Sequence, residues 1–182
     1  MAEDTRHAES SKLVAFYRGE RPDIRRRSID EIRAWDDAQL EAVHDYIQWL
    51  FPTRERSRFN PMAPVLDPET IQAFRTDATL RAGLGASFRR MLQFYGFTLE
   101  EQEGSLQVTP SAEWATRKRV WLTPGNHNFL RITRILSCLA TLGLGEHAEA
   151  FLHALNAVYR DEAQRIIPME TLLFWQRAAT ER

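Results

Sequence analysis

The chain has 182 residues, a formal net charge of −1 at pH 7 and 43% hydrophobic residues. This length suits one domain with a sizeable core, and the near-neutral charge argues against a surface that binds polyanions as a whole. Nucleic acid is therefore a disfavoured partner. The single cysteine, Cys138, excludes a disulfide framework and a cysteine-rich metal site. Because Cys138 stands in an apolar helical pattern, we expect it to be buried rather than nucleophilic.

The N-terminal segment MAEDTRHAESS is polar and acidic and lacks the apolar core of a signal peptide. No apolar run approaches the ~20 residues that a helix needs to span a bilayer. We therefore expect a cytoplasmic protein without a transmembrane segment. Residues 1–9 are expected to form a flexible tail, and residues 10–180 a single helical domain.

Helices dominate the first half of the chain. Each expected helix begins at a Ser or Asp that can cap free backbone N–H groups, and Gly or Pro closes several of them. Ser28 and Glu31 have the spacing of a capping box. The expected helices cover residues 10–18, 28–35, 36–51, 67–75 and 77–95, and a polar, proline-rich connection covers residues 53–66.

The second half contains the only β-like material, at residues 97–109. Two short runs flank Gly104 and Ser105 there, which predicts a small hairpin. Further helices are expected over residues 114–122, 127–142 and 146–160 and from Pro168 onward, with Gly143 and Gly145 ending the second of these. The predicted class is all-α, with about seven or eight helices.

The segment NHNFLRITRILSCLATLGL, residues 126–144, carries a polar stripe beside its apolar face. The stripe consists of His127, Arg131, Arg134 and Cys138. Residues three or four apart are neighbours on a helix surface, and Asn126 or Asn128 can cap its start. Free N–H groups and forked guanidinium groups suit a carboxylate, a phosphate or an acidic residue of a partner. The alternative is that both arginines pair with acidic residues of the same fold.

A second candidate is HDYIQWLFP, residues 44–52. Its aromatic residues surround the helix axis, as expected for a deeply buried helix. Buried Trp and Tyr side chains need polar partners, and His44, Gln48 and nearby arginines could supply them. The alternative is that Tyr46, Gln48 and Trp49 line a pocket.

Motifs for catalysis and metal binding are lacking. The sequence contains no GxGxxG, Walker A, HExxH or GxSxG pattern. The five histidines have no recognised metal-ligand spacing, and His147 and His153 are expected at the surface or an edge. We therefore predict no catalytic residue, no metal and no cofactor. The run Arg25-Arg26-Arg27 is interpreted as a solvated charge cluster.

The two motif blocks, HDYIQWLFP and NHNFLRITRILSCLATLGL, together resemble the conserved N-terminal region of the opioid growth factor receptor family. LDPETIQAFR (66–75) and MLQFYGF (91–97) are also similar to family segments, so the resemblance covers roughly Phe16 to Leu155. It implies a helical receptor-like domain. Vertebrate members are described as enkephalin receptors that associate with the nuclear envelope and restrain cell growth. The resemblance carries over no catalytic residue.

The chain differs from the vertebrate pattern, because it is compact and rich in arginine and shows no long repeat tail or nuclear-import cluster. We interpret it as a bacterial stand-alone copy of the conserved region, for which an enkephalin ligand is not expected.

The favoured function is a non-enzymatic binding module for an unknown peptide, protein or small anion. Its expected ligand-binding residues are Asn126, His127, Asn128, Arg131, Arg134, Tyr46, Gln48 and Trp49. One alternative is an enzyme for a phosphorylated or acyl substrate, in which His127 transfers protons and Arg131 and Arg134 stabilise charge. The other is a purely structural protein-interaction domain, with the arginines in an internal ion-pair network.

Overall fold

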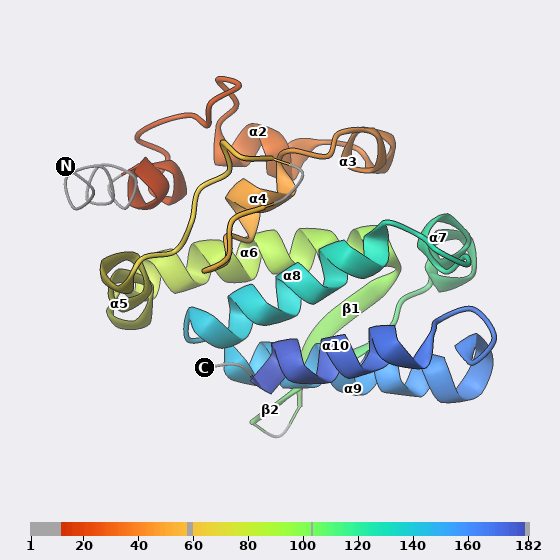
Figure 1. The fold of residues 1–182 in the computed structure, drawn as a ribbon. Helices are drawn as coiled ribbons and strands as arrows, with labels where there is room; N and C mark the ends of the chain where they lie inside the picture. The colour runs from red at the N-terminus through yellow and green to blue at the C-terminus, as the bar shows by residue number, and fades with distance from the viewer. Residues whose placement is uncertain (1–11, 58–59, 103, 181–182) are drawn as a thin grey trace. The chain divides into compact units, whose positions relative to one another are not determined.

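The computed structural model describes residues 12–57, 60–102 and 104–180, and the chain divides into two compact units, Met1–Ser87 and Phe88–Arg182. The expected all-α class is confirmed, with one small antiparallel hairpin (Figure 1). The division between the units falls inside α6, Ala78–Tyr95. The expected tail at residues 1–9 lies outside the described residues, and the single domain over residues 10–180 stays a prediction.

Short, well-capped helices build the first unit. Residues 12–17 are helical, and Gly19 follows them with φ at 73°. In α2, Ile29–Ala34, the predicted capping box is confirmed. The Glu31 amide donates to Ser28 Oγ at 3.1 Å, and the Ser28 amide donates to Glu31 Oε2 at 2.6 Å.

The single helix expected over residues 36–51 is a wrong prediction, because the chain forms two helices there. They are α3, Asp37–Ala42, and α4, Ile47–Leu50. Asp36 caps α3 as predicted, in a capping box with Gln39. The helix then ends at Val43, whose backbone is extended at φ −92° and ψ 135°. No Gly or Pro causes this break, so its reason is tertiary.

The connection after α4 is held by its own contacts. Thr53 and Val65 form a parallel β-bridge, and the Leu66 amide donates to the Thr53 carbonyl at 3.0 Å. Asp67 then caps α5, Pro68–Thr76, by accepting a hydrogen bond from the Thr70 amide at 2.7 Å. The expected helix start at Asp67 is therefore confirmed, with Pro68 at the first helical position.

Aromatic rings make up much of the core of the first unit. The rings of Phe16 and Trp49 are 5.2 Å apart, and those of Tyr17 and Phe74 are 4.8 Å apart, both in edge-on geometry. The Tyr17 hydroxyl donates to the carbonyl of Leu50. This bond satisfies a buried phenol and ties the first helical segment to the end of α4.

Four helices and the hairpin form most of the second unit. The expected hairpin is confirmed as β1, Phe97–Gln102, and β2, Ser105–Pro110, with Phe97 opposite Pro110. The helices are α7, Trp114–Trp121; α8, Asn128–Thr141; α9, Gly145–Val158, continued by a π-helical turn at Tyr159–Ala163; and α10, Met169–Thr180. β2 packs on α9, and α8, α9 and α10 pack against one another (Figure 1).

Glycine 143 ends α8 with φ at 92°, as predicted, whereas Gly145 begins α9 instead of closing α8. Within the described residues, no helix has the length and apolar character needed to cross a bilayer.

Buried tryptophans of the second unit donate to backbone carbonyls. Trp121 Nε1 donates to the carbonyl of Tyr95, and Trp175 Nε1 donates to the carbonyl of Phe129, each at 3.0 Å. The second bond joins α10 to the start of α8. Cys138 is fully buried, as expected, and burial raises the pKa of its thiol. The thiol therefore stays protonated and unreactive.

Glycine is required more strongly at position 96 than at position 104. Both have positive φ, 87° and 78°. A Cβ at Gly96 would lie 2.8 Å from Arg117 Cβ and 3.1 Å from Trp114 Cα, whereas a Cβ at Gly104 meets nothing within 4 Å. Gly104→Ala should cost about 1–2 kcal/mol of unfolding free energy, from backbone strain alone. Gly96→Ala should cost about 1–3 kcal/mol more, because the new methyl group clashes. Urea denaturation of both variants measures the difference, and equal losses would contradict it.

His147, which was expected at the surface or an edge, is half-buried, with its ring edge-on to Phe88 at 6.1 Å. Burial lowers the pKa of His147 below its ordinary value of 6.5, and the charge of Arg89 lowers it further, against a smaller opposing effect of Glu146. The folded state therefore holds this proton less tightly than the unfolded chain does.

This shift predicts a pH dependence of stability. The contribution of His147 is fully present above about pH 6.5 and is lost as the pH falls through the range down to the lowered pKa. His147→Phe should therefore flatten the fall in unfolding free energy over the pH range below about 6.5. Chemical denaturation across that range tests this, with the exposed His153→Phe as control. An unchanged slope in His147→Phe would refute the assignment.

Candidate functional site

The start of α8 is organised by Asn126. Its Oδ1 accepts hydrogen bonds from the Asn128 amide at 2.9 Å and from Asn128 Nδ2 at 3.0 Å. Its Nδ2 donates to Thr123 Oγ1 at 2.9 Å and to the Val120 carbonyl at 3.0 Å. Of the two predicted capping residues, Asn126 therefore binds the free N–H. His127 holds the position just before α8 without capping it through its side chain.

Asn128 extends this network along α8. Its Oδ1 accepts hydrogen bonds from Arg131 Nη1 at 3.3 Å and from the Tyr95 hydroxyl at 3.5 Å. Its Nδ2 lies 3.4 Å from His127 Nε2. Asn128 is completely buried and Arg131 is only 5% exposed. The polar stripe therefore does not lie on a solvent-exposed face of α8.

Arg134 lies one turn further along the same side of α8, before the buried Cys138. Burial lowers the pKa of Arg134, and the interaction with Cys138 opposes this effect. The guanidinium nevertheless stays charged at neutral pH. We call Asn126, His127, Asn128, Arg131 and Arg134 the α8 cluster. It gathers positive charge where water is largely excluded, the setting in which charge-assisted hydrogen bonds are strongest.

The other predicted residues, Tyr46, Gln48 and Trp49, lie together on α4 and at its start, in the first unit. The Tyr46 hydroxyl donates to the backbone carbonyl of Leu40 at 3.2 Å, so this partner is backbone rather than one of the expected side chains. The Tyr46 ring packs edge-on against Trp35, with centroids 5.5 Å apart. All three predicted residues are buried.

Two polar atoms of α4 are buried without a hydrogen-bond partner. They are Gln48 Oε1 and Trp49 Nε1, an acceptor and a donor on adjacent residues. Among the described residues, the third such atom is Arg27 Nη2, which contacts Asp23 Oδ2 as an ion pair at 2.6 Å. An unsatisfied buried polar atom costs roughly 1–3 kcal/mol. Two neighbouring ones in a well-packed segment therefore require an explanation.

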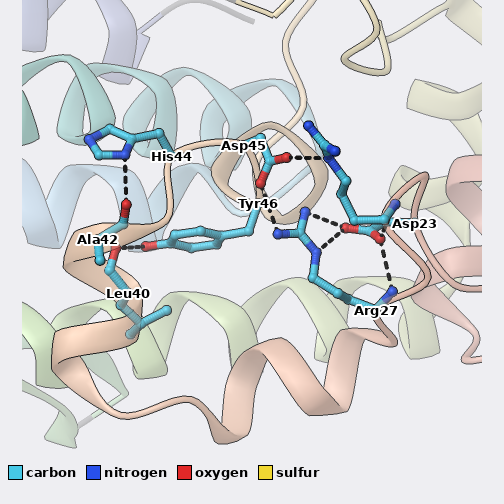
Figure 2. Close-up of polar contacts among 8 residues, drawn as sticks. Asp23, Arg27, Leu40, Ala42, His44, Asp45 and Tyr46 are labelled. Atoms are coloured by element: carbon cyan, nitrogen blue, oxygen red, sulfur yellow. Dashed lines mark hydrogen bonds and ion pairs between the residues drawn. The ribbon is translucent and has the colours of Figure 1, made fainter.

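A charged network holds the segment that leads into α4 (Figure 2). Arg27 Nε donates to Asp23 Oδ2 at 2.7 Å, and Arg27 Nη1 donates to Asp45 Oδ1 at 2.8 Å. Asp23 Oδ1 also accepts from the amides of Arg25 and Arg27, at 2.8 and 2.9 Å. Arg27 lies 5.4 Å from the centroid of the Trp35 ring. Because Asp45 faces Arg27, the backbone leaves the helical path between α3 and α4.

The electrostatics of this network follow from its geometry. Burial by itself lowers the pKa of Arg27, but the hydrogen bonds and charges of Asp23 and Asp45 outweigh it and raise that pKa overall. Burial opposes the charged form of Asp45, yet Arg27 and the more exposed Arg25 lower the pKa of Asp45 overall. Both partners are therefore held in their charged forms.

The network corrects the interpretation of the arginine run as solvated. Arg27 is an internal ion-pair partner with a side chain 17% exposed, whereas the side chain of Arg25 is 69% exposed. Asp23, Arg27 and Asp45 are structural supports of the segment before α4 that the sequence did not reveal. The Asp23–Arg27 spacing of four residues was visible, but such pairs are usually helical. Here the pair spans a loop with Arg26 at φ 62°.

The structure thus places the predicted residues in two groups. The α8 cluster belongs to the second unit, and Tyr46, Gln48 and Trp49 belong to the first. A shared ligand pocket stays a prediction. Within the described residues, no group of three His, Cys, Asp or Glu side chains could hold a metal ion.

Removing Arg27 should destabilise the first unit strongly. Arg27→Ala leaves the buried carboxylate of Asp23 with backbone donors alone, at an expected cost of about 2–4 kcal/mol. Arg25→Ala, two residues away, removes an exposed charge and should cost less than about 1 kcal/mol. Guanidinium denaturation compares the two variants. Similar losses would mean that the network does not hold the entry to α4.

Comparison with known proteins adds the family. The model of the opioid growth factor receptor (OGFr) conserved region matches residues 7–179. The opioid growth factor receptor of Rattus norvegicus is 41% identical over 160 residues, which cover 84% of this chain and 27% of that protein. The human opioid growth factor receptor is 38% identical over 123 residues, which cover 66% of this chain and 18% of that protein.

The opioid growth factor receptor-like protein 1 of Xenopus tropicalis is 35% identical over 119 residues, covering 64% of this chain and 22% of that protein. The chain therefore spans only about a quarter of the length of these relatives, or less. No solved structure gives a significant match. Because the conserved-region model matches nearly the whole chain, this chain belongs to the opioid growth factor receptor family.

Proposed function

We propose that the chain is a non-enzymatic binding module whose ligand is a peptide or a small anion. The observation that carries this proposal is the pair of uncommitted polar atoms on α4, Gln48 Oε1 and Trp49 Nε1. Each residue of a peptide offers one N–H donor and one C=O acceptor. A peptide therefore brings the two kinds of group that these atoms lack. The relatives' name, opioid growth factor receptor, also describes proteins that receive a ligand.

The α8 cluster supports the anionic part of the proposal. Arg131 is held by Asn128, which is itself held by Asn126, so its guanidinium is positioned before any ligand arrives. Positioning in advance reduces the entropy lost on binding. A carboxylate or phosphate is the group that a forked guanidinium recognises best. We therefore propose two separate recognition elements: Gln48 and Trp49 on α4 in the first unit, and the α8 cluster in the second unit.

The proposal is tested by thermal unfolding with a panel of phosphate, sulfate, dicarboxylates and short peptides, enkephalin included. A ligand at ~100 times its dissociation constant should stabilise the protein by ~2.7 kcal/mol. Trp49→Phe replaces the indole with a smaller aromatic ring and so removes the unpartnered donor Nε1. It should weaken peptide binding by about 1 kcal/mol, roughly fivefold, without the loss of any existing hydrogen bond.

A matched control is Trp175→Phe, because Trp175 Nε1 already donates to the Phe129 carbonyl. This control should lower the unfolding free energy of the free protein by about 1–3 kcal/mol and leave the response to peptide unchanged. Arg134→Gln should remove the response to anions only. If no ligand shifts the unfolding midpoint of the parent protein, the structural-interaction alternative replaces the binding module.

A further inference from the structure

The outer side of α10 exposes an apolar surface that the fold leaves uncovered. Leu173 is 45% exposed, Phe174 48% and Met169 56%. Of the three apolar residues Leu172, Leu173 and Trp175, only Leu172 and Trp175 are buried. The buried side of α10 consists of Leu172, Trp175, Ala178 and Ala179.

Two opposite charges frame this surface. Glu170 and Arg177 are exposed and stand three residues outside the Leu173–Phe174 pair, one on each side. Spacings of three and four place all four residues on one face of the helix. Neither charge makes an ion pair with another residue in the described part of the chain. We call Glu170, Leu173, Phe174 and Arg177 the α10 outer face.

This order of charges is complementary to itself. In a twofold-symmetric pair of antiparallel helices, a contact between residue i of one copy and residue j of the other occurs twice, because residue j of the first copy also contacts residue i of the second. With the axis between Leu173 and Phe174, Glu170 of one copy meets Arg177 of the other, and the reverse pair forms as well. The helix dipole explains an acidic first turn and a basic last turn. It does not explain why both charges share a face with two exposed apolar side chains.

We propose that the α10 outer face binds a second copy of this chain in an antiparallel, twofold-symmetric helix pair. Leu173 and Phe174 of both copies form its apolar centre, and two Glu170–Arg177 pairs fix its direction. Large exposed apolar side chains rimmed by polar groups mark such interaction surfaces. A second copy is the occupant that the charge order favours, since it supplies both complementary charges at the required positions.

Sedimentation equilibrium of the full chain over micromolar to millimolar concentrations measures the association. The parent chain should form a dimer, and Phe174→Glu should weaken it by at least ~100-fold, because the new charge is buried at the centre. Far-ultraviolet circular dichroism checks that the variants stay folded. Glu149→Arg, an equal charge reversal at an exposed site on α9, is the control and should leave the dimer intact.

Charge exchange tests the antiparallel geometry. Glu170→Arg alone and Arg177→Glu alone should each weaken the dimer by roughly 10-fold or more, because like charges then face each other. The double variant should recover most of the affinity, and a mixture of the two single variants should form heterodimers. A parent chain that stays monomeric throughout overturns the proposal. A dimer that Phe174→Glu and the charge reversals leave unchanged overturns it as well.

Discussion

A buried polar or charged group needs a hydrogen-bond or ion-pair partner, and this requirement determines the structure between α3 and α4 and at the start of α8. A lost hydrogen bond to a buried group costs about 1–3 kcal/mol, and more if the group is charged, which is a large share of the stability of a domain. Arg27 satisfies two carboxylates and draws the chain out of helix between α3 and α4. At the start of α8, Asn126 accepts a hydrogen bond from the Asn128 amide, and Asn128 accepts one from the buried Arg131.

The exceptions to this requirement are as informative as its fulfilment. Gln48 and Trp49 are held in place by a network that satisfies its own charges, yet each keeps one buried polar atom without a partner. Natural proteins tolerate such costs mainly where a ligand, a water molecule or a conformational role compensates for them. The ion pairs before α4 thus fix the backbone, while the unpartnered atoms of Gln48 and Trp49 remain available for an added partner.

Membership of the family and the binding proposal rest on different kinds of observation. The family follows from similarity along nearly the whole chain. The ligand does not follow from it, because a fold or a family name does not determine the chemistry of a site. The proposed recognition elements are the α8 cluster and α4, whereas the α10 outer face is a surface that neither of them uses.

The sequence by itself determined the helical class, most helix boundaries, the capping residues and the hairpin. These depend on local rules, such as the Ser28–Glu31 box and the left-handed Gly143 that ends α8, which act between residues close in the chain. Only the tertiary structure decided the break at Val43, the role of Arg27 and the exposure of Leu173. Asp23 and Asp45 meet Arg27 across a loop, and exposure depends on which helices cover which face. Neither is encoded in the spacing of neighbouring residues, because both arise from contacts between segments that the fold brings together.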